Sequence, residues 1–234
     1  MLILICGTDS KDVPISVGRP RAFYNLKNCY LGHTYFCELG GMYKLWKQVN
    51  TDIVGLEHYR RCFVMQSSGS YDPHAYNILN RCDAKDILDE YDAIVTFHQH
   101  TPGRSAYSFL EVSHYTKMFN AWLDIVEEGT PGFKQFCLDW LHHDMLICCN
   151  MFIARKELID KYCEWLFANT RAFMRKYPLS EKRYRHIGYL GEFTFGSWLL
   201  FNKYRLYLQP HIRFNKELTE LEEVERTTIC REEI

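Results

Sequence analysis

The sequence lacks a long apolar run and an excess of either charge. Its first apolar run, Leu2–Cys6, has no basic flank and is much shorter than a signal-peptide core or a membrane span of about 20 residues. The 28 Lys and Arg residues nearly balance the 29 Asp and Glu residues, and the net charge is −1 at pH 7. Such a balance provides no overall field that would attract nucleic acid or an anionic membrane. We therefore expect a cytoplasmic protein with no transmembrane segment and no nucleic-acid partner, which holds any anionic ligand through local groups.

Metal-binding and redox cysteine motifs are absent as well. The ten cysteines are scattered, two of them are adjacent (Cys148 and Cys149), and none forms a Cys-x-x-Cys pair. We interpret them as reduced, mostly buried thiols. The sequence also has no internal repeat, low-complexity stretch or clear linker. One domain is therefore expected over residues 1–214, followed by a charged tail over residues 215–234 that is helical or frayed.

Apolar residues, which make up 47% of the chain, follow strand and helix periods. Short apolar runs predict strands at residues 2–6, 52–56, 93–97, 149–154 and 205–210. Apolar residues three and four apart predict helices at residues 35–49, 84–91, 107–128, 133–143, 156–177 and 187–204. Strands that alternate with helices in this way indicate an α/β domain. Ligands of open α/β sheets bind beyond the carboxyl ends of the strands.

The segment Gly55–Arg61 gathers the most polar groups at the end of one predicted strand. A carboxylate, an imidazole and two arginines, Arg60 and Arg61, follow the apolar run directly. Guanidinium groups match phosphate oxygens with two parallel hydrogen bonds. One hypothesis is that these groups clamp a diphosphate, either directly or by helping to hold a metal ion. The alternative is that both arginines pair with surface carboxylates.

Histidines provide a second set of candidates. Two pairs are spaced as metal ligands can be, His98 with His100 and His142 with His143. We favour polar groups on the surface or in a cleft as the explanation of these pairs and of His211, for which contact with a donor-bound metal is the other interpretation. His114 falls on the inward stripe of the helix predicted at residues 107–128, either as a hydrogen-bonded core histidine or as a ligand contact.

Several segments, in the same order along the chain, resemble one known family. They are Tyr35–Leu39 ahead of Trp46–Lys47, Gly55–Arg61, Asn150–Ile153 ahead of Lys156–Leu158, Tyr162–Phe167 and Gly191–Glu192. These segments resemble the DUF4422 group, which is linked to capsule and exopolysaccharide biosynthesis and is similar to nucleotide-sugar transferases of the GT-A type. The resemblance implies one GT-A-like, Rossmann-like domain. Its central sheet would be mixed, mostly parallel and flanked by helices, with the donor diphosphate over the strand ends.

The resemblance also implies roles for individual residues. Gly7, Thr8 and Asp9 would bind the nucleoside, and His58, Arg60 and Arg61 the donor phosphates. Glu57, Tyr59, His114 and Asn150 are further donor-binding candidates. Many GT-A enzymes hold Mn²⁺ or Mg²⁺ with an Asp-x-Asp pair, and no such pair occurs in this sequence. Glu57 and His58 occupy that position, so these two residues and His211 are the metal candidates. Metal-independent catalysis through positive side chains is the alternative.

An inverting transferase needs a base within about 3 Å of the acceptor hydroxyl. Glu192 is the first candidate, because it lies in a glycine-flanked element that could approach a ligand closely. Asp144, which follows His142 and His143, is the second. A capping, turn or solvated role is the alternative for each carboxylate.

These expectations describe an inverting glycosyltransferase with a nucleotide-diphosphate donor. The donor would be a UDP-sugar, with UDP-galactofuranose or a related hexose among the candidates, and the acceptor a capsule, O-antigen or exopolysaccharide glycan, free or lipid-linked. A basic run could contact a lipid diphosphate or the inner face of the cell membrane; it comprises Arg171, Arg175, Lys176, Lys182, Arg183, Arg185 and His186. Two other functions stay open, a non-catalytic nucleotide- or glycan-binding module and a metal-dependent hydrolase that uses the histidine pairs.

Overall fold

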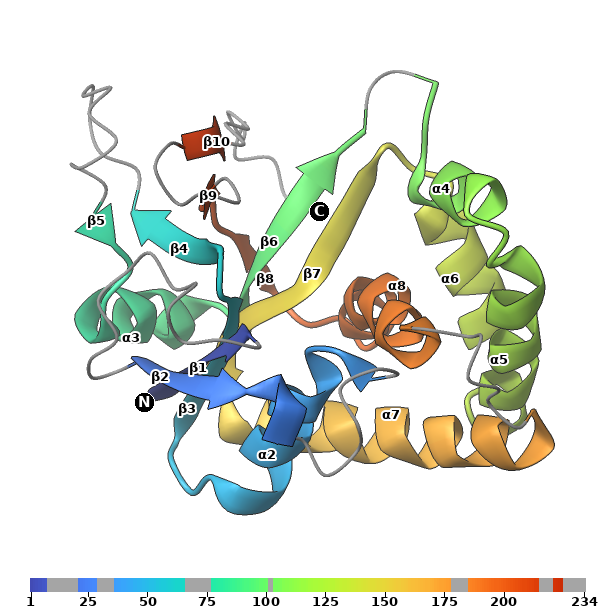
Figure 1. Ribbon diagram of the computed structural model, residues 1–234, viewed down its shortest axis with the longest axis horizontal. Helices are drawn as coiled ribbons and strands as arrows, with labels where there is room; N and C mark the ends of the chain where they lie inside the picture. The colour runs from blue at the N-terminus through green and yellow to red at the C-terminus, as the bar shows by residue number, and fades with distance from the viewer. Residues whose placement is uncertain are drawn as a thin grey trace.

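A central twisted sheet separates two unequal helical layers (Figure 1). A computed structural model describes residues 1–7, 21–28, 36–65, 77–100, 103–177, 185–214 and 221–224. One helix covers one face of the sheet, and the remaining helices lie on the other face and beyond it. This arrangement confirms the α/β class that the sequence pattern predicts.

Ten strands of the described residues form the sheet. They are β1 (Leu2–Gly7), β2 (Arg21–Asn25), β3 (Ile53–His58), β4 (Arg61–Met65), β5 (Asn77–Ile78), β6 (Ala93–Gln99), β7 (Met145–Arg155), β8 (Leu206–Leu208), β9 (His211–Phe214) and β10 (Leu221–Val224). The five predicted strands correspond to β1, β3, β6, β7 and β8. The other five are short strands that the sequence pattern does not predict. In particular, residues 221–224 belong to the tail expected to be helical or frayed, and they form a strand instead.

Six strands make up the main block, in the spatial order β2-β1-β3-β7-β6-β8. Strand β1 is parallel to β2 and β3, and β6 is parallel to β8, whereas β7 is antiparallel to both of its neighbours. Five of the six strands therefore point the same way, which confirms the expected mixed, mostly parallel sheet. Strands β4, β5, β9 and β10 form an antiparallel extension. The extension leaves β3 through the turn at Tyr59 and Arg60, beside the carboxyl ends of β1, β3 and β6.

Seven α-helices and one short 3₁₀ helix complete the described elements. They are η2 (Leu26–Asn28), α2 (Leu39–Gln48), α3 (Arg81–Glu90), α4 (Ala106–Val112), α5 (Thr116–Gly129), α6 (Phe133–Leu141), α7 (Lys156–Lys176) and α8 (His186–Phe201). The helices predicted at residues 35–49, 84–91, 133–143, 156–177 and 187–204 are confirmed as α2, α3, α6, α7 and α8. None of the helices among the described residues is both long and apolar enough to cross a membrane.

The single helix predicted at residues 107–128 is wrong, because the chain breaks it into α4 and α5. Hydrogen bonds from Tyr115 N–H to the Leu110 carbonyl (2.9 Å) and from His114 N–H to the Glu111 carbonyl (3.1 Å) close α4 with a Schellman motif. His114 takes the left-handed position of this motif, with φ +59°, and its side chain is exposed. The inward-facing histidine expected from the helical stripe is therefore a helix-ending residue on the surface.

Alternating side chains of β1 show how the sheet divides the core. Leu4 and Cys6 face the large cluster formed with α2, α5, α6, α7 and α8. Ile3, between them, faces the smaller cluster, which includes Leu88 of α3. The larger cluster fixes α8 against the sheet.

Helix α8 is buried on nearly all sides, which fits its continuously apolar sequence. A Cβ at Gly191 would lie 2.7 Å from Leu39 Cδ2, and one at Gly196 would lie 2.7 Å from Ile147 Cβ. These glycines, which weaken the helical pattern in the sequence, allow α8 to approach the start of α2 and the strand β7 closely. The approach brings the only acidic residue of α8, Glu192, to the middle of β7.

Candidate active site

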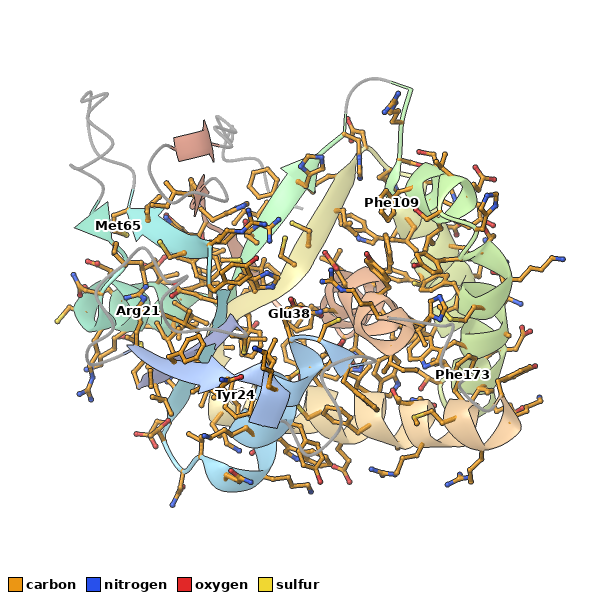
Figure 2. The ribbon with its side chains drawn as sticks, in the orientation of Figure 1. Arg21, Tyr24, Glu38, Met65, Phe109 and Phe173 are labelled. Atoms are coloured by element: carbon orange, nitrogen blue, oxygen red, sulfur yellow. The ribbon has the colours of Figure 1, made fainter. Side chains whose placement is uncertain are left out.

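A cavity of about 280 Å³ lies between the sheet and the helices α4 and α8. The strands and the residue after β6 contribute Arg61, His98, His100, Leu146, Cys148, Cys149 and His211. The helices contribute Phe109 of α4 and Tyr189, Glu192 and Phe193 of α8. Figure 2 shows Phe109 near the tip of β7, on the α4 side. The cavity is at the carboxyl end of β6 and beside that of β3, where α/β sheets bind ligands.

A large bulge in β7 forms one wall of the cavity. On β6 only Thr96 separates Val95 from Phe97, whereas on β7 their partners Phe152 and Ile147 are separated by the four residues 148–151. Two of these residues, Cys149 and Asn150, have positive φ angles of 66° and 51°. Bulges next to active sites re-aim side chains, and positive φ at residues other than glycine stores backbone strain. The bulge therefore directs otherwise sheet-bonded backbone groups toward the cavity.

The bulge holds Glu192, the first candidate for the base. The Cys149 N–H donates to Glu192 Oε1 at 2.9 Å. The pKa of Glu192 is raised, because burial disfavours its charge and the Glu38 carboxylate repels it, while the Cys149 N–H, Arg61 and Arg185 act in the opposite direction. A carboxylate with a raised pKa that faces a cavity has the properties of a general base.

The bulge also binds His58. Its Nε2 is 2.6 Å from the Cys149 carbonyl oxygen, and its Nδ1 is 3.1 Å from Arg61 Nη1. The carbonyl can only accept, so Nε2 carries the proton and Nδ1 accepts from the arginine. Burial lowers the pKa of His58, which agrees with a neutral ring. Both ring nitrogens thus bind protein groups, and His58 links Arg61 to the bulge.

Glu38 adds a negative charge beside this network. Its Oε1 lies 3.7 Å from His58 Nδ1, and its side chain is 15% exposed. Figure 2 shows Glu38 close to α8, in agreement with its repulsion of Glu192. At the residue before Glu38, Cys37 Sγ accepts from Arg185 Nε at 3.2 Å. Arg185 precedes α8 with φ +65°, and Cys37 also has a positive φ of 48°.

The two arginines of the Gly55–Arg61 segment have different surroundings. Arg61 lines the cavity, as its predicted phosphate-binding role requires. Arg60 lies over the ring of Tyr59, with its guanidinium carbon 5.2 Å from the ring centroid. Tyr59 itself is partly buried, and its N–H donates to the Cys6 carbonyl at 3.0 Å.

Glu57, a candidate for the donor and for a metal ion, is bound by other protein groups in the core. Its two oxygens accept from Arg21 Nε (2.7 Å) and Nη2 (2.8 Å), and Oε1 also accepts from Phe63 N–H (3.0 Å). The Glu57 side chain is fully buried. Arg21 also donates to the Leu79 carbonyl at 3.1 Å. This buried ion pair joins β2, β3 and β4.

The remaining predicted residues are distributed as follows. Gly7 ends β1 and packs against Tyr59, while Thr8 and Asp9 lie outside the described residues. Asn150 lies in the bulge, and its buried Oδ1 has no hydrogen-bond partner among the described residues. Asp144, the second candidate for the base, is exposed in the turn before β7, where its carbonyl accepts from His100 N–H at 2.6 Å.

The histidine pairs do not form a metal centre in the described structure. His98 and His100 line the cavity with their ring centroids 4.8 Å apart, and His211 Nδ1 is 2.5 Å from Thr96 Oγ1. His142 and His143 are exposed beyond α6. Among the described residues, no three His, Cys, Asp or Glu side chains are grouped so that they could bind one metal ion.

Sequence reasoning missed two groups that act on Glu192 and His58. They are the backbone of Cys149 and the carboxylate of Glu38. The alternation of side chains expected for a strand contains no signal for the bulge in β7, although Asn150 is a residue type that tolerates positive φ. Glu38 belongs to a segment that resembles the family, and that resemblance was the available signal.

The fold is similar to that of a solved glycosyltransferase. The chain matches the apo structure of the bifunctional glycosyltransferase WbbM with a TM-score of 0.71 and 18% sequence identity. The match covers 90% of this chain and 44% of WbbM, so the chain spans less than half the length of that protein. At this level of identity the similarity shows a shared fold.

No curated protein matches the sequence. Residues 28–203, which make up more than half of the chain, match the family described as a domain of unknown function, DUF4422. All the ordered segments noted in the sequence fall within this range. The chain therefore belongs to the DUF4422 family.

Proposed function

We propose that this protein is an inverting glycosyltransferase that moves a sugar from a nucleotide-diphosphate donor to a bacterial surface glycan. The observation that supports this proposal is a single cavity at the strand ends that both Arg61 and Glu192 line. The cavity offers a cation for a leaving diphosphate and a carboxylate with a raised pKa for an acceptor hydroxyl. The fold shared with WbbM supports the general class. The UDP-sugar donor and the glycan acceptor follow from the family resemblance.

In the proposed reaction Glu192 removes the proton of an acceptor hydroxyl. The acceptor oxygen forms a bond with the anomeric carbon of the donor as the bond from that carbon to the diphosphate breaks. Negative charge builds on the departing diphosphate, and the Arg61 guanidinium stabilises it. The proton remains on Glu192 until it passes to solvent. A base on the face opposite the leaving group inverts the configuration of the anomeric carbon.

His58 takes a positioning role in this scheme in place of the phosphate contact first considered. Its Nε2–H binds the Cys149 carbonyl, and the N–H of the same residue binds Glu192. Its Nδ1 accepts from Arg61. One neutral imidazole thus fixes both the carboxylate and the guanidinium, and a neutral ring adds no charge to compete with Arg61 for the diphosphate.

The described cavity residues do not fit Mg²⁺, and no three His, Cys, Asp or Glu side chains among the described residues are grouped to hold Mn²⁺. Magnesium binds oxygen ligands, and Glu192 is the one carboxylate among the described side chains that line the cavity. Glu57, which occupies the place of the Asp-x-Asp pair, binds Arg21 instead. We therefore assign charge stabilisation to Arg61 and derive no step through a metal ion.

Aromatic side chains of the cavity are proposed to bind sugar rings. Phe109 is 47% exposed, and its ring centroid lies 6.0 Å from that of Phe193. An exposed aromatic face at a cavity edge can pack against the apolar face of a sugar. Tyr189 adds a phenol to the same cavity. Buried Asn150 stays in the proposal as a donor-binding residue.

The proposal places the reaction in the cytoplasm, with a free or lipid-linked acceptor. The eight cysteines among the described residues form no disulfide, as is usual for proteins of a reducing compartment. Arg171, Arg175 and Lys176 are exposed on the last turns of α7 and could contact a phosphate-bearing acceptor. Lys182 and Arg183 of the same basic run lie outside the described residues.

Donor turnover tests the proposal. Purified protein would be incubated with UDP-, GDP-, CMP- and dTDP-sugars, with and without glycan acceptors, and release of the nucleotide would be measured. We expect one donor to be turned over, and Arg61→Ala to lower kcat/KM about 10²- to 10³-fold through lost charge stabilisation. Arg205→Ala is the matched control, because Arg205 is 70% exposed and pairs with Asp92 at 3.9 Å.

Three results would contradict this proposal. Donor binding without release of nucleotide would indicate the non-catalytic binding module. Hydrolysis that depends on a stoichiometric metal and needs no sugar acceptor would indicate the hydrolase. Equal activity of the two arginine variants would show that Arg61 does not contact the diphosphate.

A further inference from the structure

Two adjacent thiols meet at the wall of the cavity. Cys148 Sγ and Cys149 Sγ are 3.4 Å apart, and both residues line the cavity. Successive side chains of a regular strand point to opposite faces of the sheet, so neighbouring cysteines are normally kept apart. Here the positive φ of 66° at Cys149 turns its side chain toward that of Cys148. The bulge thus produces a close dithiol that a regular strand could not form.

We propose that Cys148 and Cys149 form a reversible redox site, which two-electron oxidants convert to a disulfide and which trivalent arsenicals bridge. A disulfide bond is about 2.05 Å long, so the two sulfur atoms must move roughly 1.4 Å closer. The pair faces a cavity, which gives a small oxidant access. This dithiol lies beside the proposed base Glu192, so its oxidation would affect the proposed active site.

The other described cysteines are less suited to such chemistry. Burial raises the pKa of Cys137 to about 12 and that of Cys163 well above its usual range. Thiolates are the reactive form, and they are scarce at such sites. Cys82 is exposed on α3 and serves as an internal reference for a single accessible thiol.

Oxidation by hydrogen peroxide is balanced as follows. One thiolate attacks a peroxide oxygen, the O–O bond breaks, and the sulfur becomes a sulfenic acid with release of water once the leaving hydroxide is protonated. The second thiol attacks this sulfur, the S–S bond forms, and a second water leaves. The two cysteines lose two electrons and two protons, and the peroxide takes both. A dithiol reductant reverses the step by exchange.

The disulfide would directly disturb the proposed active site. The small ring that it closes contains the peptide bond between Cys148 and Cys149, and therefore the N–H that donates to Glu192. Peptide groups resist distortion, so closing the ring must turn this N–H and shift its partner. This consequence rests on the proposed function, whereas formation of the disulfide does not.

Mass spectrometry of the intact chain and of its peptides tests the proposal. After mild peroxide treatment, we expect the tryptic peptide 135–155 to be lighter by two hydrogen atoms and to regain them with dithiothreitol. Fragment ions that separate Cys137 from the pair assign the loss to residues 148 and 149. Phenylarsine oxide is expected to add once to the native chain, releasing water as its arsenic binds both sulfurs.

Substitutions identify the thiols. Cys148→Ser and Cys149→Ser are each expected to abolish the arsenical adduct and the loss of hydrogen, whereas Cys82→Ser retains both. The native chain provides the mass measurement even where a serine variant does not fold. Peptides that stay fully reduced at residues 148 and 149 while Cys82 is oxidised would overturn the proposal. Separate oxygen adducts on the two sulfurs would overturn it equally.

An activity measurement separates the redox site from the proposed function. Peroxide is expected to lower nucleotide release by the native chain about a hundredfold or more, as loss of a positioned base does, and dithiothreitol to restore it. The activity of Cys148→Ser should be the same before and after treatment. Full activity of the disulfide form would overturn the coupling. A chain with no transferase activity that still forms the disulfide would refute the transferase and leave the redox site intact.

Discussion

Replacing Glu192 by glutamine should remove catalysis and leave the fold in place. Glutamine has nearly the same shape, and its amide oxygen can still accept from the Cys149 N–H, which is 2.9 Å from Glu192 Oε1. The change removes the carboxylate as a proton acceptor. Loss of a general base typically lowers kcat by about 10²- to 10⁴-fold, or about 3–5 kcal/mol of barrier at about 1.36 kcal/mol per decade. The KM for the donor should change little, because Arg61 is retained.

The same variant should be more stable than the native chain at neutral pH. The pKa of Glu192 is higher in the folded state than in the unfolded chain. Ionisation of Glu192 therefore destabilises the fold as the pH rises from the unfolded pKa through the folded pKa. Each unit of difference between the folded and unfolded pKa values corresponds to about 1.4 kcal/mol of unfolding free energy. Glutamine carries no charge, so the gain in melting temperature should be present at neutral pH. The gain should disappear at acidic pH, below the pKa of Glu192 in the unfolded chain, where Glu192 is protonated in both states.

Nucleotide-release kinetics and thermal unfolding at neutral and acidic pH measure both effects. Glu164→Gln is the matched control, because Glu164 is exposed on α7. An unchanged kcat in Glu192→Gln would refute the role of this residue as the base. A lower melting temperature at neutral pH would refute the account of its raised pKa.

Three further perturbations test the surroundings of the site. Glu38→Gln removes the charge that helps raise the pKa of Glu192, so the acidic limb of the pH profile of kcat/KM should move to lower pH; an unmoved limb would contradict this coupling. His58→Ala should lower kcat more than it raises the KM for the donor, and His58→Gln should restore part of the loss through its side-chain N–H; a change confined to KM would indicate a donor contact instead. Arg21→Ala leaves the Glu57 charge buried and unpaired, so urea unfolding should show a loss of about 3–5 kcal/mol, and a loss under about 1 kcal/mol would contradict the structural role of the pair.

Helices and central strands could be predicted where the apolar period is continuous. Helix α7 has its apolar residues three and four apart over its full length, and its prediction at residues 156–177 is nearly the observed Lys156–Lys176. The start of α3 lay three residues ahead of its prediction, although Asn80 and Asp83 form a capping box that the sequence displays. The break at His114 could not be foreseen, because the apolar stripe continues on both sides of it and no glycine marks the left-handed residue.

The candidate site could be predicted in part from its charged residues. Arg61 and Glu192 stand out because each follows or interrupts an apolar element, and the structure brings both to one cavity. The bulge that joins them depends on backbone groups of Cys149, which no residue pattern reveals. Glu57 shows the converse, since a carboxylate at a strand end in the sequence is a buried partner of Arg21 in the fold. That partner comes from β2, a short strand that the apolar pattern does not predict.

A structure of the protein with a bound nucleoside diphosphate tests the central claim most directly. UDP would be used first, followed by GDP. The account predicts that oxygens of the diphosphate lie within hydrogen-bond distance, about 2.7–3.2 Å, of the Arg61 guanidinium in the cavity that Glu192 lines. A diphosphate bound away from Arg61, or in a site that Glu192 does not face, would contradict it.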